Sequence, residues 1–295
     1  MQIYRESFAA PEAKILVVDD NEMNLFVVTN LLKKTGMEII CCDRGEKCLE
    51  LVKKDVFDVI LLDHMMPGMD GIETMKQLKI MEDNLCKDAP VIALTANAIV
   101  GVREMYLQEG FDDYLSKPIE SEKLEHMLKH YIPEAKIQTV HEGKAEKQST
   151  ASNNAEQRTV CVAEALAEKP AGMRTETLIR GTVNLFLGLQ YSAGDAGMYK
   201  EFLRMFCDMS KEKNEKIQAC YEQENWEEYT VLVHALKSTS LSVGAQKLSE
   251  KALELEKAGK ENRLSYIFDN HEAMLELYKA TVQEGRQILE SDICI

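Results

Sequence analysis

The chain lacks the features of several protein classes. None of its 8 cysteines forms a C-x-x-C pair, and it contains no run of about 18 or more apolar residues. Residues 1–14 contain no apolar core like that of a signal peptide. Scattered cysteines are typical of buried residues in a reducing compartment. We therefore expect a soluble, cytoplasmic chain with neither a disulfide framework nor direct membrane insertion.

A basic segment is also absent. The net charge is −15, and residues 1–132, 133–176 and 177–295 carry −9, −1 and −5. An acidic surface repels nucleic acid and anionic lipid. We therefore exclude nucleic acid as a partner and expect no DNA-binding output domain.

The first part of the chain alternates short apolar runs with amphipathic stretches. The apolar runs are residues 14–18, 38–42, 57–62, 90–94 and 112–116. Continuous β-branched runs of this length are typical of strands covered on both faces. Residues 12–132 are thus predicted to form a doubly wound α/β domain with a five-stranded parallel sheet.

The rest of the chain has two different patterns. Residues 133–176 contain no Phe, Trp or Tyr and are predicted to be a flexible linker, with a short helix near 161–166. Residues 177–292 show apolar residues at three- and four-residue spacing, and Gly244 and Gly259 lie where helices should end. This part is predicted to be an all-α four-helix bundle.

Chemically useful side chains follow four of the predicted strands. Asp19 and Asp20 follow the first, Asp63 the third, Thr95 the fourth and Lys117 the fifth. Ligands of open parallel sheets bind outside the carboxyl ends of the strands, so these side chains should converge. Carboxylates bind Mg²⁺, and one carboxylate can act as a phosphoryl acceptor whose charge Lys117 would neutralise. Taken singly, residues of these types at strand ends are more often turn or helix-cap residues. The prediction of a functional site depends on all of them meeting at one end of the sheet.

The predicted bundle holds a second candidate. His234 lies at the margin of an apolar helical stripe, with Lys237 one turn later and the small Ser238 beyond it. A neutral imidazole nitrogen accepts a phosphoryl group near pH 7, and an adjacent ammonium screens the phosphoryl charge. A single histidine on a helix is more often an ordinary surface residue, so this helix by itself is a weak signal.

Residues 14–132 resemble the response-regulator receiver domains of two-component systems, especially those attached to hybrid sensor histidine kinases. The matching segments are KILVVDDNEMNL (14–25), VILLDHMMPGMDG (59–71), VIALTANA (91–98) and FDDYLSKPI (111–119). The resemblance implies a flavodoxin-like fold and phosphorylation of Asp63.

The resemblance also implies roles for the residues around Asp63. Asp20, Asp63 and the backbone carbonyl of Met65 would hold Mg²⁺, and Asp19 would act partly through water. Thr95 and Tyr114 match the pair of residues that switches conformation on phosphorylation. Lys117 matches the ion-pairing lysine. His64, directly after the acceptor, is interpreted as a loop residue.

Residues 177–290 resemble a histidine-phosphotransfer domain. The match rests on His234-Ala-Leu-Lys237, on Gly244-Ala245 and on residues 188–206. It implies phosphorylation of His234. The residue after the lysine is commonly Gly in this family, whereas this chain has Ser238.

These patterns predict a phosphorelay protein. An upstream histidine kinase would phosphorylate Asp63, and His234 would exchange the phosphoryl group with a downstream response regulator. No ATP-binding segment is visible, and the chain could be the cytoplasmic C-terminal part of a hybrid sensor kinase. Two alternatives remain. The bundle could be a docking module that transfers nothing, or Asp63 could accept and hydrolyse phosphoryl groups as a phosphatase drain.

Overall fold

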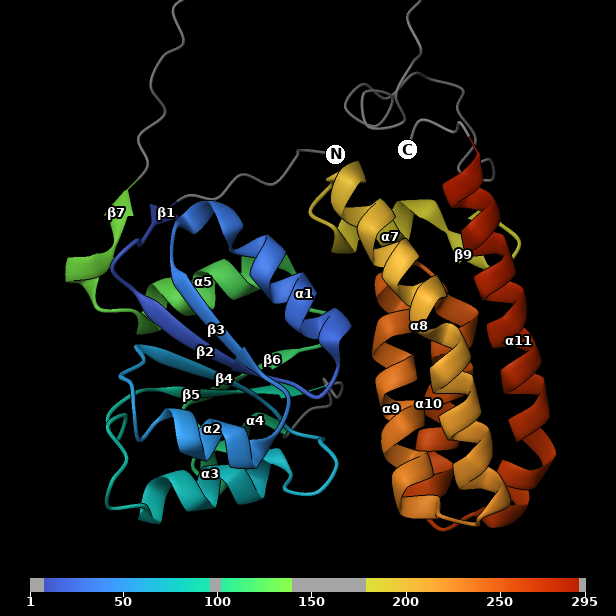
Figure 1. Cartoon of the computed structure of the whole chain (residues 1–295), viewed down its shortest axis with the longest axis horizontal. Coiled ribbons are helices and arrows are strands. Elements are labelled where there is room, and N and C mark those ends of the chain that lie inside the picture. Colours follow the sequence, from blue (N-terminus) through green and yellow to red (C-terminus); the bar gives the residue numbers. More distant parts are fainter. Residues whose placement is uncertain (1–7, 96–101, 140–178, 292–295) are drawn as a thin grey trace, which may run out of the picture.

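The structure is a computed structural model that describes residues 8–95, 102–139 and 179–291 (Figure 1). The N-terminal domain contains a five-stranded parallel sheet in the order β3-β2-β4-β5-β6. Its strands are β2 (Lys14–Val18), β3 (Glu38–Cys42), β4 (Val59–Asp63), β5 (Val91–Thr95) and β6 (Asp113–Ser116). The predicted sheet is confirmed, and its strand bounds differ from the predicted runs by at most two residues.

Helices cover both faces of this sheet. They are α1 (Glu22–Leu31), α2 (Gly45–Leu51), α3 (Gly71–Ile80), α4 (Val102–Glu109) and α5 (Ser121–Tyr131). Helices α1 and α5 lie on one face, and α2, α3 and α4 lie on the other (Figure 1). Alternate strand residues divide between the two faces, since Ile15 and Val17 join one buried cluster and Leu16 and Val18 the other.

The N-terminal domain extends beyond the predicted boundary. A short 3₁₀ helix, η2 (Glu134–Lys136), leads into β7 (Gln138–Thr139), which pairs antiparallel with β1 (Phe8–Ala9). The first residues of the predicted linker therefore belong to the folded domain. The rest of that linker, including the helix predicted near 161–166, lies outside the described residues, and the domain boundaries otherwise stay predictions.

The second domain is a helical bundle, as predicted. A hairpin of β8 (Ile179–Arg180) and β9 (Val183–Asn184) leads into the short helix α7 (Leu185–Tyr191). The four long helices are α8 (Ala196–Glu222), α9 (Trp226–Ser242), α10 (Gln246–Lys260) and α11 (Leu264–Glu290). None of the helices in the described part of the chain is long and apolar enough to cross a membrane.

The two predicted helix-ending glycines have different roles. Gly244 follows α9 with a φ of +81°, the left-handed conformation in which helices often end. Gly259 lies in the last turn of α10, one residue before its end, as predicted. A Cβ at Gly259 would lie 2.0 Å from Oγ1 of Thr230, which explains why this position needs glycine where α9 and α10 meet.

The two domains contact each other through α1 and α8 (Figure 1). The Phe26 ring of α1 meets the Phe202 ring of α8 edge to face, with 5.6 Å between centroids. Lys213 of α8 donates a hydrogen bond to Oδ1 of Asn21 at 3.1 Å. This contact brings one side of the bundle to the carboxyl end of the sheet.

Candidate functional site

Three carboxylates gather at the carboxyl end of the sheet. Asp19 and Asp20 follow β2, and Asp63 ends the neighbouring strand β4. One oxygen from each lies within 4.8 Å of the others, which is a spacing that could hold one metal ion. Asp19 and Asp63 are buried, whereas Asp20 is half-buried. The convergence predicted from the strand ends is therefore confirmed.

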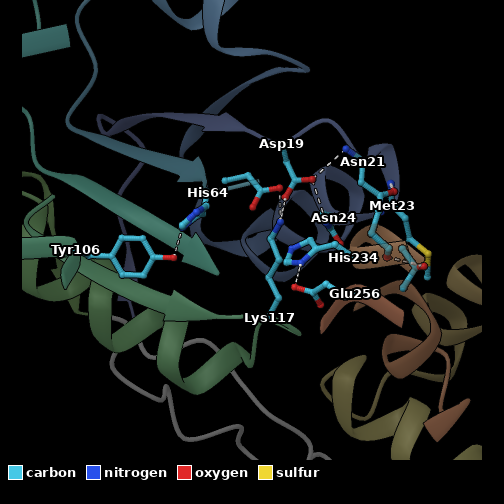
Figure 2. Close-up of polar contacts among 12 residues, drawn as sticks. Asp19, Asn21, Met23, Asn24, His64, Tyr106, Lys117, His234 and Glu256 are labelled. Atoms are coloured by element: carbon cyan, nitrogen blue, oxygen red, sulfur yellow. Dashed lines mark hydrogen bonds and ion pairs between the residues drawn. The ribbon is translucent and has the colours of Figure 1, made fainter. Parts of the chain in front are cut away.

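Lys117 follows β6 and extends across the carboxyl end of the sheet to this cluster (Figure 2). Its Nζ lies 2.6 Å from Oδ2 of Asp19 and 2.7 Å from Oδ2 of Asp63. Burial by itself lowers the pKa of Lys117, but the attraction of Asp19 and Asp63 outweighs it and raises that pKa. Lys117 therefore stays an ammonium ion inside the site.

Asp63 has one oxygen without a partner. Its Oδ2 faces Lys117, while its buried Oδ1 accepts no hydrogen bond from the described residues. Burial raises the pKa of Asp63 to about 8, the charge of Asp19 adds to this rise, and Lys117 opposes it. An unpaired carboxylate oxygen beside two further acids suits a divalent cation, because such an ion would stabilise the charged form.

The Asp19 carboxylate is held in place by the start of α1. Its Oδ1 accepts from the backbone N–H of Asn21 at 3.0 Å and from Nδ2 of Asn24 at 2.9 Å. Its Oδ2 is ion-paired with Lys117. Met65 lies in the loop after β4, and its predicted carbonyl contact to a metal stays a prediction.

Thr95 lies in a group of hydrogen-bonded and stacked side chains from several elements. Thr95 is buried at the end of β5, and its side chain shares a hydrogen bond with the Tyr106 hydroxyl of α4. Tyr106 is also buried, and its hydroxyl lies 2.5 Å from Nδ1 of His64. The Tyr114 ring stacks on the Tyr106 ring at 6.3 Å. Tyr106 was not among the site residues predicted from the sequence, and the switch role of Thr95 and Tyr114 stays a prediction.

His64 is a half-buried loop residue, as interpreted, but it is not isolated. Burial lowers its pKa, so its ring is neutral near pH 7. It lines a cleft of about 850 Å³ between the loop after β4 and the bundle, together with Met66, Trp226 and Lys260. No sequence pattern distinguishes Tyr106, its hydrogen-bond partner, from an ordinary core residue of α4.

His234 lies in the middle of α9 and is buried, with 6% of its surface exposed. Its Nδ1 lies 2.9 Å from Oε1 of Glu256 on α10, and its Nε2 has no partner among the described residues. Burial lowers the pKa of His234 to about 4, while Glu256 opposes this shift. The ring is therefore neutral near pH 7. Because a carboxylate only accepts, Nδ1 carries the proton and Nε2 presents its lone pair.

Glu256 connects His234 to two lysines. Its Oε2 accepts from Lys237 at 2.5 Å, and its Oε1 accepts from Lys260 at 2.6 Å. Lys237 thus lies beside His234, as predicted, but is joined to it through Glu256. Nothing in the sequence indicated Glu256, because it comes from a different helix.

The two constellations lie together. Figure 2 shows the Lys117–Asp19 pair of the N-terminal domain beside the His234–Glu256 pair of the bundle. The charge of Lys117 contributes to lowering the pKa of both His234 and Lys237. Ser238, one turn after His234, is buried and its Oγ has no partner in the described structure. Both domains contribute one buried atom without a hydrogen-bond partner in the described structure, Oδ1 of Asp63 and Nε2 of His234.

Comparison with known protein families gives a match for each domain. The family model "Response regulator receiver domain" matches residues 15–129, and the model "Hpt domain" matches residues 201–290. Both candidate acceptors lie inside these matches.

Similar proteins match over one or both domains. The signal transduction histidine-protein kinase BarA of Escherichia coli is 30% identical over 222 residues, which is 75% of this chain and 21% of BarA. The sensor protein GacS of Pseudomonas syringae is 38% identical over 112 residues, covering 38% of this chain and 12% of GacS. This chain therefore spans about a fifth or less of these relatives.

A solved structure is also similar. It is the receiver domain of the sensor histidine kinase PA1611 from Pseudomonas aeruginosa, with magnesium coordinated in its active-site cleft. It is 33% identical and covers 40% of this chain and 96% of its own, with a TM-score of 0.37.

Proposed function

Because this chain joins a response regulator receiver domain to an Hpt domain, the combination typical of two-component phosphorelays, we propose that it passes a phosphoryl group between Asp63 and His234. The chain is homologous to the hybrid sensor kinases BarA and GacS. In the proposed relay, an upstream histidine kinase phosphorylates Asp63, and His234 exchanges the group with a downstream response regulator. One observation carries the proposal: the unpaired Oδ1 of Asp63 and the unpaired Nε2 of His234 belong to domains docked against each other.

The first step loads the receiver. An oxygen of Asp63 attacks the phosphorus of an upstream phosphohistidine, so that an O–P bond forms and the N–P bond breaks. Lys117 remains paired with Asp19 and offsets the negative charge near the phosphoryl oxygens. Asp19, Asp20 and Asp63 would hold Mg²⁺, which when bound neutralises charge on the phosphoryl group.

The second step unloads the receiver. The Nε2 lone pair of His234 attacks the phosphorus, the new N–P bond forms, and the Asp63 carboxylate leaves. Glu256 keeps the proton on Nδ1 and offsets the positive charge that develops on the ring. The docked bundle excludes water from this region, since both acceptor side chains are buried. The same geometry serves transfer in the reverse direction.

The docking contact supports transfer within one chain. Phe26 and Phe202 hold α1 against α8, and Lys117 lies close enough to His234 to act on its pKa. Tethered domains have an effective concentration of about a millimolar for each other. We therefore propose that the Asp63–His234 exchange runs in cis.

The test follows the phosphoryl group by intact and peptide mass spectrometry, with acetyl phosphate as donor and Mg²⁺ present. Wild type should carry label on Asp63 and His234. Asp63→Asn should lose label from both residues, and His234→Gln should retain it on Asp63 alone. Label that stops at Asp63 in wild type would leave a receiver-switched docking protein. Rapid loss of that label to water, with no acceptor, would instead support the phosphatase drain.

A further inference from the structure

Lys213 is a basic residue of the bundle that reaches the acidic edge of the receiver. It lies in the middle of α8, and its Nζ donates to Oδ1 of Asn21 at 3.1 Å. Asn21 directly follows Asp19 and Asp20 and caps the start of α1. The Hpt domain thus places a cation next to two of the three carboxylates that gather at the end of the sheet.

The charges of Lys213 and of the acidic cluster act on each other. Burial lowers the pKa of Lys213, while Asp20, Asp19 and Glu22 raise it. Conversely, burial and Asp19 raise the pKa of Asp20 to about 6, while Lys117 and Lys213 both lower it. Lys213 is therefore within electrostatic range of the site that would hold Mg²⁺ and the phosphoryl group.

We propose that Lys213 is a specificity-determining residue that makes the Hpt domain dock more tightly on the phosphorylated than on the unphosphorylated form of its Mg²⁺-loaded receiver. This inference rests on the proposed function. Phe26 and Phe202 contribute apolar packing to the docking contact, and Lys213 makes the strength of docking depend on the charge of the receiver site.

The charges at the site favour docking to the phosphorylated form. Asp19, Asp20 and Asp63 with Lys117 leave two negative charges when all four are ionised, and Mg²⁺ cancels both. A phosphoryl group with about two negative charges replaces the single charge of the Asp63 carboxylate, so the loaded site regains about one negative charge. Lys213 faces a neutral site before phosphorylation and an anionic site after it. Attraction between the domains therefore rises when the receiver is loaded.

This difference in docking strength sets the order of phosphorylation, transfer and release of the Hpt domain. A loaded receiver retains the Hpt domain until His234 has taken the phosphoryl group, and the unloaded, Mg²⁺-bound receiver then releases it. Release matters because the docked bundle covers the site at which an upstream phosphohistidine would load Asp63. Lys213 is attracted more strongly to the metal-free site, which carries two negative charges, than to the neutral Mg²⁺-bound site. By linkage, it must therefore weaken Mg²⁺ binding in the docked chain.

The test measures the Mg²⁺ dissociation constant of the full chain by calorimetric titration at fixed pH and ionic strength. Lys213→Met should bind Mg²⁺ about three- to tenfold more tightly than wild type, the size expected for one half-buried cation facing the ion. Lys213→Arg, which keeps the charge, should bind like wild type. The matched control is Lys211→Met, an exposed lysine of the same helix, which should also bind like wild type.

A second measurement follows docking itself. Small-angle scattering should give a more compact wild-type chain with Mg²⁺ and beryllofluoride, a phosphoryl mimic of equal charge, than with Mg²⁺ alone. The difference should shrink in Lys213→Met and persist in Lys211→Met. Equal Mg²⁺ affinities in all four proteins, or equal compaction of the Mg²⁺-bound wild type with and without beryllofluoride, would overturn the inference. Failure of the relay is separate, because it appears as unlabelled His234 in wild type whatever the Mg²⁺ affinities are.

Discussion

The position of one proton on the His234 ring decides whether this residue can accept a phosphoryl group. Glu256 accepts from Nδ1 and leaves the buried Nε2 without a partner. Glu256 is itself buried and is held by Lys237 and Lys260. Because Glu256 acts through His234, it is a positioning residue in the proposed transfer.

Replacing Glu256 should therefore slow transfer. Glu256→Ala should lower the rate of His234 labelling by about 10- to 100-fold, since one charge-assisted hydrogen bond is worth about 1.5–3 kcal/mol. Glu256→Gln keeps an acceptor for Nδ1–H and should retain more of the rate. Nitrogen chemical shifts of the ring should show a mixed tautomer in Glu256→Ala only.

The control for this prediction is Glu250→Ala, at an exposed position of the same helix. It should leave both the rate and the tautomer unchanged. An unaltered labelling rate in a folded Glu256→Ala protein would contradict the positioning role.

The pKa of His234 also predicts how stability depends on pH. Burial lowers this pKa from 6.5 to about 4, so the unfolded chain binds the proton more readily than the folded chain. The free energy of unfolding should then be unaffected by His234 above pH 6.5 and should fall as the pH drops from 6.5 to 4. The loss due to this residue is at most about 3 kcal/mol.

Urea unfolding of the bundle checks this sign, because the only tryptophan, Trp226, lies at the start of α9 and reports on it. His234→Gln should have a shallower decline of stability over this pH range. It should keep some decline, because burial also lowers the pKa of His271. A slope equal to that of wild type would exclude a buried neutral His234.

At the scale of elements, the contact between α1 and α8 docks the domain that carries Asp63 against the domain that carries His234. Phe26 is half-buried and meets Phe202, which is fully buried in the bundle. Apolar contact of this kind does not depend on charge, so it contributes equally to docking of the phosphorylated and unphosphorylated forms. Lys213 accounts for the proposed difference in docking strength between the two forms.

Phe26→Ala should weaken docking. Loss of one aromatic anchor typically costs about 1–3 kcal/mol, so His234 labelling should slow by about 5- to 100-fold while Asp63 labelling stays normal. Ile80→Ala, at an exposed apolar residue on α3, is the matched control and should change neither rate. A normal His234 rate in Phe26→Ala would show that transfer does not use this docking contact.

At the scale of the whole molecule, the tether predicts that the proposed transfer runs within one chain. Docking through α1 and α8 presents His234 to the receiver of the same chain. Transfer in cis should not depend on protein concentration, whereas transfer between chains should be proportional to it.

A mixture of Asp63→Asn and His234→Gln proteins tests this route, because each variant retains one acceptor. At about 10 µM protein, labelling of His234 in the mixture should be about 100-fold slower than in wild type, the ratio of that concentration to a millimolar effective concentration. Equal rates, or a wild-type rate that scales with dilution, would establish transfer in trans.

The sequence by itself determined the two domains and most of the site. Continuous apolar runs predicted strands buried on both faces, and neighbouring parallel strands end on the same side of the sheet, so Asp19, Asp63 and Lys117 had to converge. The helical stripe likewise placed His234 and Lys237 on neighbouring positions of one face. These relations depend on local periodicity and on sheet topology, and both can be inferred from the amino-acid sequence.

Only the tertiary structure decided the rest. Glu256 reaches His234 from the next helix, Tyr106 reaches Thr95 and His64 from α4, and Lys213 reaches Asn21 across the domain contact. Such contacts depend on the angle and separation at which elements pack. No local pattern encodes these quantities, because many residues of the same type occupy equivalent positions along each helix and only packing selects one of them.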